Sequence, residues 1–406
     1  MAVRHICLIC HNEIPHAGAS CPHCKTRLSS VVGATPQLLV IIFAVMIASF
    51  VGTGFLNGSF RAERSARARI HLQTARTLSD YGLHERSVSQ FRESLTYAPN
   101  DIGTRLGMAQ SLYYLDRLSE AENHLLNLIE AAPTLADANR LLARIAERDN
   151  RLDDAIHYYR MAIHGEWRVS PQQNRIRTRF ELIALLEQRG EDMQATGELV
   201  DLLRESPDDA RIRKRIGRHF LRVGSPNHAL QVFEEIAARD PADGEAHAGV
   251  GEAEFDLEQY YSARTAFQRA LRLLPGDTEI QQRLELLDQI RALDPTYRPY
   301  GNALAAAERY RRAREVLGRV VKVIERCVNP YAGPEFVGPP RPVPGSLQPW
   351  FEQAREQLER RLSATDDRIA AVISLAEELW ARRQDVCGSA DPAGEPLTHV
   401  MSKLAS

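Results

Sequence analysis

Prolines recur at a constant interval of about 34 residues through the middle of the chain, and this interval constrains the fold more than any other feature. The step from Pro99 to Pro133 equals the steps from Pro207 to Pro241 and from Pro241 to Pro275. A constant period of this length is the mark of a stacked structural repeat, because each unit adds one supersecondary element to the stack. We therefore predict a repeat array over residues 68–277.

Small and large apolar residues recur in register with the prolines. Twelve residues upstream of each proline position stand small residues: Ser87, Ala121, Ala155, Ala195, Ala229 and Ala263. Four residues later come Phe91, Leu125, Tyr159, Leu199, Phe233 and Phe267, and three after those come Ser94, Leu128, Ala162, Leu202, Ile236 and Ala270. An earlier position holds Ala75, Ala109, Ala143, Ile183, Gly217 and Gly251. This spacing places the residues on one face of a second helix, against a first helix whose small residues allow close approach.

This pattern resembles the tetratricopeptide repeat, met six times over about half of the chain. The resemblance implies an all-α solenoid of about six helix-turn-helix repeats closed by a capping helix. The sequence departs from the family in lacking its early tryptophan, in having Trp167 where the third repeat should have proline, and in about six extra residues near Val169–Arg175. The last two of these departures lie at the junction between the third and fourth repeats. An ordinary helical bundle with chance spacing is the alternative.

Four of the six cysteines lie close to the start of the sequence, as two CxxC pairs. Cys7 and Cys10 form the first pair, and Cys21 and Cys24 form the second. Two such pairs complete the four-sulfur tetrahedron that structural Zn²⁺ prefers, and the segment is too short to fold on an apolar core. We predict a small zinc-ribbon-like module over residues 1–30 with no ligand position left for water.

Three other readings of these cysteines stay open. Iron in a rubredoxin-like site would use the same four sulfurs. Cys7-x-x-Cys10-His11 also matches the c-type haem attachment motif, although Lys25 and not histidine follows the second pair. A redox dithiol is the third reading, and nothing nearby matches the strand–helix setting of such motifs.

No charged residue occurs between Leu28 and Phe60, and Leu38–Leu56 is almost wholly apolar. About nineteen such residues at 1.5 Å per residue span a hydrocarbon core of about 30 Å. We predict one uncleaved transmembrane helix over residues 36–58, with a buried core helix as the alternative.

Two signals conflict on the orientation of this anchor. Cationic residues are more numerous after the apolar segment than before it, which favours cytoplasmic repeats. They are Arg61, Arg64, Arg67 and Arg69 on one side and Lys25 and Arg27 on the other. Metal-binding thiolates persist best in a reducing compartment, which favours a cytoplasmic metal module and a periplasmic array. We adopt the second orientation, in a bacterial inner membrane, since arginine dominates over only four lysines as in high-GC bacterial genes.

The inner groove of the predicted array carries basic and aromatic residues. They are Tyr113 and Tyr114 in the second repeat, Arg140, Arg144 and Arg148 in the third, and Arg211, Lys214, Arg218 and Arg222 in the fifth. Such a stripe can bind acidic side chains or the terminal carboxylate of a protein or peptide partner. The alternative is a solvated helix face.

The remainder of the chain reads as further helices and a linker. Residues 278–328 are predicted to be a capping helix and a long helix, 329–349 a proline-rich linker, 350–386 a helical hairpin and 387–406 a disordered tail. The apolar stripe of residues 366–383 is expected to be core. The sequence leaves open whether Cys327 and Cys387 pair.

The composition and motifs favour a binding protein over an enzyme. The 51 basic and 53 acidic residues balance, so nothing predicts a nucleic-acid partner. We find no nucleotide-binding glycine loop and no nucleophile–base arrangement, and we expect no small-molecule substrate. The expected function is a membrane-anchored scaffold. The alternatives are a regulator or assembly factor in envelope biogenesis, by analogy with the rubredoxin-bearing regulator of lipopolysaccharide synthesis, and a haem-bearing electron carrier.

Overall fold

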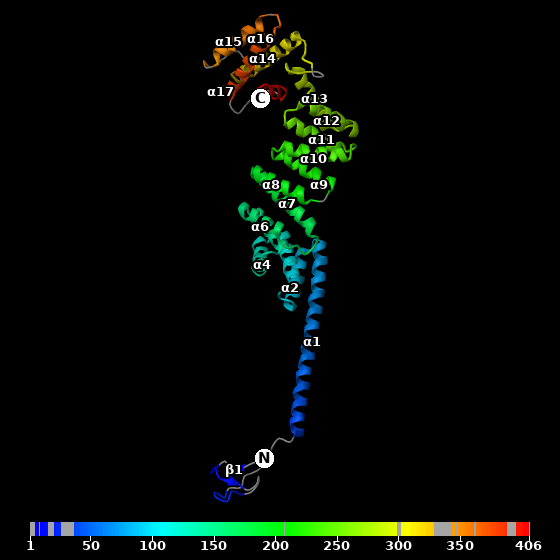
Figure 1. Cartoon of the computed structure of the whole chain (residues 1–406), viewed down its shortest axis with the longest axis vertical. Coiled ribbons are helices and arrows are strands. Elements are labelled where there is room, and N and C mark those ends of the chain that lie inside the picture. Colours follow the sequence, from blue (N-terminus) through cyan, green and yellow to red (C-terminus); the bar gives the residue numbers. More distant parts are fainter. Residues whose placement is uncertain are drawn as a thin grey trace. The chain divides into compact units, whose positions relative to one another are not determined.

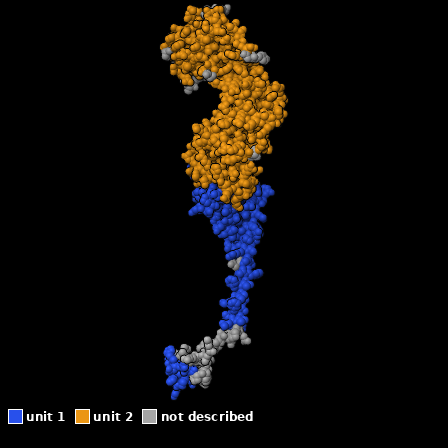
Figure 2. Space-filling model, viewed as in Figure 1, with its two compact units in different colours: residues 1–151 blue, residues 152–406 orange. Residues whose placement is uncertain are grey.

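The computed structural model describes residues 5–7, 9–14, 20–25, 36–206, 208–298, 302–328, 343–345, 347–360, 363–387 and 395–405. The chain divides into two compact units, Met1–Arg151 and Leu152–Ser406, which Figure 2 colours separately. Pro207 and most of the predicted proline-rich linker lie outside the described residues.

The first unit contains a two-stranded antiparallel ribbon and a series of helices joined by short turns (Figure 1). Its elements are β1 (His5–Ile6), β2 (Glu13–Ile14), α1 (Pro36–Asp80), α2 (His84–Tyr97), α3 (Ile102–Tyr114), α4 (Leu118–Ala131) and α5 (Ala136–Arg148). The predicted transmembrane segment and the first repeat helix are one helix, α1, of 45 residues.

The second unit continues the helix pairs and ends in a group of further helices (Figure 1). The paired helices are α6 (Leu152–His164), α7 (Pro171–Gln188), α8 (Asp192–Glu205), α9 (Ala210–Arg222), α10 (Pro226–Arg239), α11 (Gly244–Asp256) and α12 (Tyr260–Leu273). They are followed by α13 (Thr278–Leu293), α14 (Ala306–Val328), α15 (Gln348–Glu359), α16 (Asp366–Arg382), α17 (Gln384–Cys387) and α18 (Glu395–Ala405). Helix α13 begins at Thr278, where the predicted capping helix begins.

The positions that define the repeat pattern are buried in every repeat. None of the second-helix residues in the pattern is more than 4% exposed. Where serine replaces an apolar residue, its hydroxyl is satisfied: Ser87 Oγ donates to the Ala75 carbonyl at 2.8 Å, and Ser94 Oγ donates to the Ala68 carbonyl at 2.9 Å. The periodic pattern therefore marks the packing surface between helices, as predicted.

Each turn within a repeat uses a left-handed residue that our reading of the pattern overlooked. These residues are Gly82, Asp116, Asn150, Gly190, Gly224 and Glu258, with φ between 58° and 74°. In each case the next residue donates its N–H to the carbonyl five positions back, as Leu83 does to Leu78 at 2.9 Å and Gln259 does to Glu254 at 2.8 Å. This hydrogen bond satisfies the end of the first helix and reverses the chain. These positions keep the period of the prolines except between Asn150 and Gly190, where the extra residues fall.

The absence of a side chain at Gly249 is required by the packing of Phe233. A Cβ on Gly249 would lie 2.4 Å from Phe233 Cδ1, and that ring is 2% exposed. Gly197 in α8 has no atom within 4 Å of the equivalent position. Alanine stabilises either helix by about 1 kcal/mol relative to glycine, but overpacking at Gly249 costs about 1–3 kcal/mol.

We therefore expect Gly249→Ala to be less stable than Gly197→Ala by about 1–3 kcal/mol in urea unfolding monitored by circular dichroism. Equal unfolding midpoints for the two variants would contradict this packing.

The helices after the array share one apolar core with its last repeats. Phe267 of α12, Ile290 of α13, Leu317 of α14 and Leu379 of α16 all belong to this core and are at most 1% exposed. The apolar stripe of α16 is thus interior, as expected for a structural element.

A disulfide joins Cys327 at the end of α14 to Cys387 in α17, with their Cα atoms 4.9 Å apart. The sequence left this pairing open, because 60 residues separate the two cysteines. The bond ties the long helix α14 to α17, which follows α16 directly in the chain.

The prediction of a disordered tail is wrong for residues 395–405, which form α18. Leu397, Val400 and Met401 are at most 4% exposed within the common core. The other face of this segment is polar, which led to the prediction of disorder. Its apolar face is buried only because helices distant in sequence provide the rest of the core.

A buried carboxylate fixes α18 to the end of the array. The Asp294 side chain is fully buried and accepts hydrogen bonds from Lys403 Nζ at 2.6 Å, from Thr296 Oγ1 at 2.7 Å and from the Tyr261 hydroxyl. Burial by itself would raise the pKa of Asp294, but the hydrogen bonds from Lys403, Tyr261 and Thr296 outweigh it and hold that pKa below its ordinary value. Ionised Asp294 thus stabilises the folded state.

Replacing Lys403 by methionine is expected to lower the free energy of unfolding by about 3 kcal/mol at pH 7, because it leaves a buried charge without its cation. A depressed carboxyl pKa contributes stability above the unfolded pKa of about 4 and loses it as the pH falls through the folded value. The deficit of Lys403→Met should therefore shrink below pH 4 in urea unfolding. Lys322→Met on exposed α14 surface is the matched control, and a deficit that does not change with pH would exclude this role of Asp294.

Candidate functional site

The N-terminal module brings its four cysteines together. The sulfurs of Cys7, Cys10, Cys21 and Cys24 all lie within 4.8 Å of one another. Cys7 Sγ lies 3.7 Å from Cys24 Sγ, and Cys10 Sγ lies 3.4 Å from Cys21 Sγ. Cys7 and Cys10, the two cysteines of the alternative haem attachment motif, thus belong to the same four-sulfur cluster as Cys21 and Cys24.

Each cysteine pair is held by a similar turn. The His11 N–H donates to the Cys7 carbonyl at 2.8 Å, and the Lys25 N–H donates to the Cys21 carbonyl at 2.9 Å. His11 and Lys25 both have a positive φ, of 59° and 51°. The two strands pair His5 with Ile14 and support the first turn. Two like turns therefore present two sulfurs each to one point.

The sulfur arrangement fits a tetrahedral metal ion. A Zn–S distance of about 2.3 Å requires sulfurs about 3.8 Å apart, close to the two separations above. Backbone N–H groups of Cys10 and Ile9 point at the Cys7 sulfur and lower the pKa of that thiol. The Asn12 N–H acts in the same direction on Cys10, but the neighbouring cysteine sulfurs and burial outweigh it and raise the pKa of Cys10 to about 12. Four cysteines in this geometry can hold Zn²⁺ or iron, and they leave no ligand position for hydrolytic chemistry.

Helix α1 is long and apolar enough to cross a membrane. The stretch that meets this test begins at Leu39 and has a mean hydropathy of 2.5. Its apolar side chains are exposed, including Phe50 at 82% and Phe55 at 77%. The first buried residue further along the helix is Ala68, which packs against α2. An exposed apolar surface of this length is unfavourable in water and matches a lipid environment.

The predicted groove residues of the first unit form an aromatic and arginine cluster. Arg144 and Arg148 lie over the Tyr113 ring, at 5.2 Å and 4.2 Å from its centroid. Arg148 also pairs with Asp116 at 3.2 Å. Tyr114 is 51% exposed and makes an edge contact with Tyr113. Arg140 is on the same helix as these arginines. Tyr113 is therefore a buried support, whereas the Tyr114 ring is half exposed and stacks on His84 with ring centroids 4.8 Å apart.

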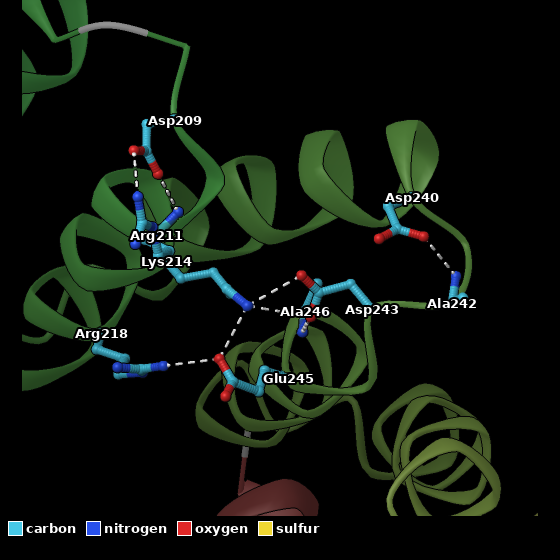
Figure 3. Close-up of polar contacts among 9 residues, drawn as sticks. All are labelled: Asp209, Arg211, Lys214, Arg218, Asp240, Ala242, Asp243, Glu245 and Ala246. Atoms are coloured by element: carbon cyan, nitrogen blue, oxygen red, sulfur yellow. Dashed lines mark hydrogen bonds and ion pairs between the residues drawn. The ribbon is translucent and has the colours of Figure 1, made fainter.

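The predicted groove residues of the second unit are paired with carboxylates (Figure 3). Lys214 is 15% exposed and contacts Asp243 at 3.0 Å and Glu245 at 2.9 Å. Arg218 also contacts Glu245, at 3.1 Å, and Arg211 contacts its own N-cap residue Asp209 at 3.4 Å. The helices α9 and α11 are thereby linked through their charged faces.

Arg222 has a partner as well, Glu187 of α7 at 2.8 Å, and the same carboxylate accepts from His219. Apart from Arg211, the expected basic stripe of the second unit is therefore a row of ion pairs between successive repeats. Asp209, Asp243 and Asp277 recur every 34 residues, each as the N-cap of the first helix of a repeat or of α13. This periodicity was the sequence signal from which part of the ion pairing could have been predicted.

The extra residues between the third and fourth repeats help to line a cavity of about 460 Å³. Its lining residues are Pro171, Gln172, Arg175, Ile176, Arg179, Leu202 and Glu205. Arg179 is almost fully buried and pairs with Glu198 at 3.3 Å and Glu205 at 2.9 Å. Its charge is thus offset within the wall of the cavity.

Comparison with known proteins identifies the repeats. The model of the tetratricopeptide repeat family matches residues 106–171 and 214–278. A comparison with curated protein sequences finds no match. Since the helix pairs, the buried pattern and this match agree, the chain carries tetratricopeptide repeats, and its fold is an all-α tetratricopeptide solenoid.

Similar solved structures include other repeat proteins of low sequence identity. MamA residues 41 to the end from Desulfovibrio magneticus RS-1 is 22% identical, with 38% of this chain and 83% of that chain covered and a TM-score of 0.30. PilF of Pseudomonas aeruginosa is 14% identical over 54% and 97%, with a TM-score of 0.38. PilW, described as a type IV pilus biogenesis factor, is 16% identical over 53% and 98%, with a TM-score of 0.37.

Proposed function

We propose that this chain is a membrane-anchored, non-enzymatic scaffold that captures protein or peptide partners with its tetratricopeptide array. The observation that carries the proposal is the cluster of Tyr114, Tyr113, Arg144 and Arg148 in the first unit. Tyrosine and arginine dominate the binding energy of protein interfaces, because they bury much area and hydrogen-bond in a fixed geometry. In the second unit, Lys214, Arg218 and Arg222 pair with carboxylates of neighbouring repeats, so we assign them to the packing of the array and not to partner binding.

The anchor is proposed to be the N-terminal half of α1, in a bacterial inner membrane. Its apolar side chains have no protein partner among the described residues, and the helix runs without interruption into the first repeat. The repeats are thus attached to the membrane without a flexible linker.

The metal module is proposed to be cytoplasmic and the array periplasmic. The described cysteines fall into two chemical states, four in the module that form no disulfide and one disulfide between Cys327 and Cys387. Disulfides persist in oxidising compartments, and metal-binding thiolates persist in reducing ones. A membrane between the two sites satisfies both conditions. We propose that the module holds a structural Zn²⁺ through Cys7, Cys10, Cys21 and Cys24.

Partner capture is tested by charge reversal in the first unit. Arg144→Glu together with Arg148→Glu is expected to reduce recovery of crosslinked partners from membranes by at least about tenfold, since arginine hot spots contribute about 2 kcal/mol or more. The control is Arg269→Glu with Arg272→Glu, two exposed arginines on α12. Circular dichroism checks that both variants keep their helicity. Equal recovery from the two variants would refute a binding role for the cluster.

The topology is tested by reporter fusions after Ala305. A periplasmic reporter is expected to be active at this position and a cytoplasmic reporter inactive. The opposite result would place the array in the cytoplasm and refute the proposed orientation. It would not affect the scaffold proposal, which the crosslinking experiment tests separately.

A further inference from the structure

We propose that the segment of α1 just beyond its apolar run is a binding surface for anionic phospholipid headgroups. This surface, the arginine belt, consists of Arg61, Arg64, Arg67 and Arg69, and the inference rests on the proposed membrane anchor. In the sequence these residues served only as a signal for the orientation of the anchor. Their position along a continuous α1 gives them a different environment.

The belt begins at the depth of the headgroups and continues beyond it. The uncharged part of α1 ends at Phe60, which is 66% exposed, and Arg61 follows it directly. At 1.5 Å per residue, Arg64 lies about 6 Å and Arg69 about 14 Å beyond Phe60. The polar layer on each side of a bilayer is about 5–8 Å thick. Long arginine side chains can extend toward that layer, so all four cations can reach lipid phosphates.

Most of the charge of the belt is not neutralised by the protein. The only carboxylate in the segment, Glu63, pairs with Arg67 at 2.6 Å. Within the described part of the chain, Arg61, Arg64 and Arg69 have no carboxylate partner; Arg64 donates to the Thr96 carbonyl and Arg69 to the Ser65 carbonyl, both at 3.3 Å. The predicted groove cations of the second unit, in contrast, each contact a carboxylate. Three cations without a carboxylate partner among the described residues thus follow directly after the uncharged part of α1.

The first repeat itself stands at the level of the belt. Ser94 and Thr96 near the carboxyl end of α2 contact α1 at Ala68 and Arg64, and Arg67 lies 5.9 Å from the centre of the Tyr97 ring. Figure 1 shows α2 beside the last turns of α1. Tyrosine is enriched at membrane–water interfaces because its ring is apolar and its hydroxyl polar. Tyr97 therefore complements the arginines in a headgroup contact that holds the array close to the bilayer.

The test uses the full chain in nanodiscs of phosphatidylcholine with a minority of phosphatidylglycerol. Lipids that remain bound are counted by native mass spectrometry. Near a membrane surface, one arginine contributes about 1 kcal/mol toward anionic lipid, which is about a fivefold preference. The wild-type chain is expected to retain phosphatidylglycerol at least about fivefold in excess of its share of the bilayer.

Arg61→Gln with Arg69→Gln is the informative variant, because neither arginine contacts another helix among the described residues and the fold should persist. Its control is Arg76→Gln with Arg86→Gln, which removes two exposed arginines from the far end of the same helix pair. Loss of the excess in the first variant alone supports the belt. A wild-type chain that inserts but shows no excess, or an excess that survives in the first variant, would overturn it. Failure to insert would instead refute the membrane anchor.

Discussion

Removal of the metal proposed for the N-terminal module is expected to unfold the described residues of that module while the helices of the repeats persist. The described apolar core of this module consists of Ile14 and the cysteines themselves, so little buried surface opposes chain entropy. Structural zinc contributes an apparent 10–16 kcal/mol or so to the folding of such small modules. The expected loss far exceeds what any single core substitution causes.

The measurement is metal content together with limited proteolysis, before and after chelation. Cys24→Ser should lower the bound metal and expose the module to protease, while the neighbouring His23→Ser should retain it. Elemental analysis of the purified chain distinguishes zinc from iron. Loss of the metal in His23→Ser would show that the donor set is not four cysteines.

Loss of the disulfide is expected to destabilise the C-terminal helices by about 4 kcal/mol, because the bond closes a loop with a sequence separation of 60. Cys327→Ser with Cys387→Ser removes it, and unfolding in urea can be followed by tryptophan fluorescence, to which Trp380, 8% exposed in this core, contributes. A reducing agent should shift the wild-type midpoint and leave the double variant unchanged. Equal midpoints for wild type and variant without reductant would mean that the bond does not constrain these helices.

The repeat array could be predicted because its information is local and periodic. Residues such as Ala121 and Leu125 lie four apart and share one face of a helix, and the same relation recurs in every repeat. The left-handed turn residues follow the same period, so Gly82, Gly190 and Gly224 carried a signal that the prolines overshadowed. The convergence of the four cysteines was also predictable, because each pair is close in sequence.

The partners of the groove residues could not be predicted in the same way. Whether Lys214 is free or neutralised depends on Asp243 and Glu245, which belong to the start of the next repeat and reach it only across a helix interface. Arginine at helical spacing is consistent with an open basic surface and with a row of ion pairs. Only the relative rotation of α9 and α11 distinguishes the two.

Local pattern alone was thus sufficient for the helix pairs, their buried faces, the four-cysteine cluster and the apolar segment, since each depends on residues within a few turns of one another. Folding in three dimensions decided the pairing of Cys327 with Cys387, the burial of α18 against Asp294 and the pairing of Lys214 with Asp243. The physical reason is that these contacts join residues far apart in sequence. Their energies depend on surfaces that exist only after the repeats have stacked.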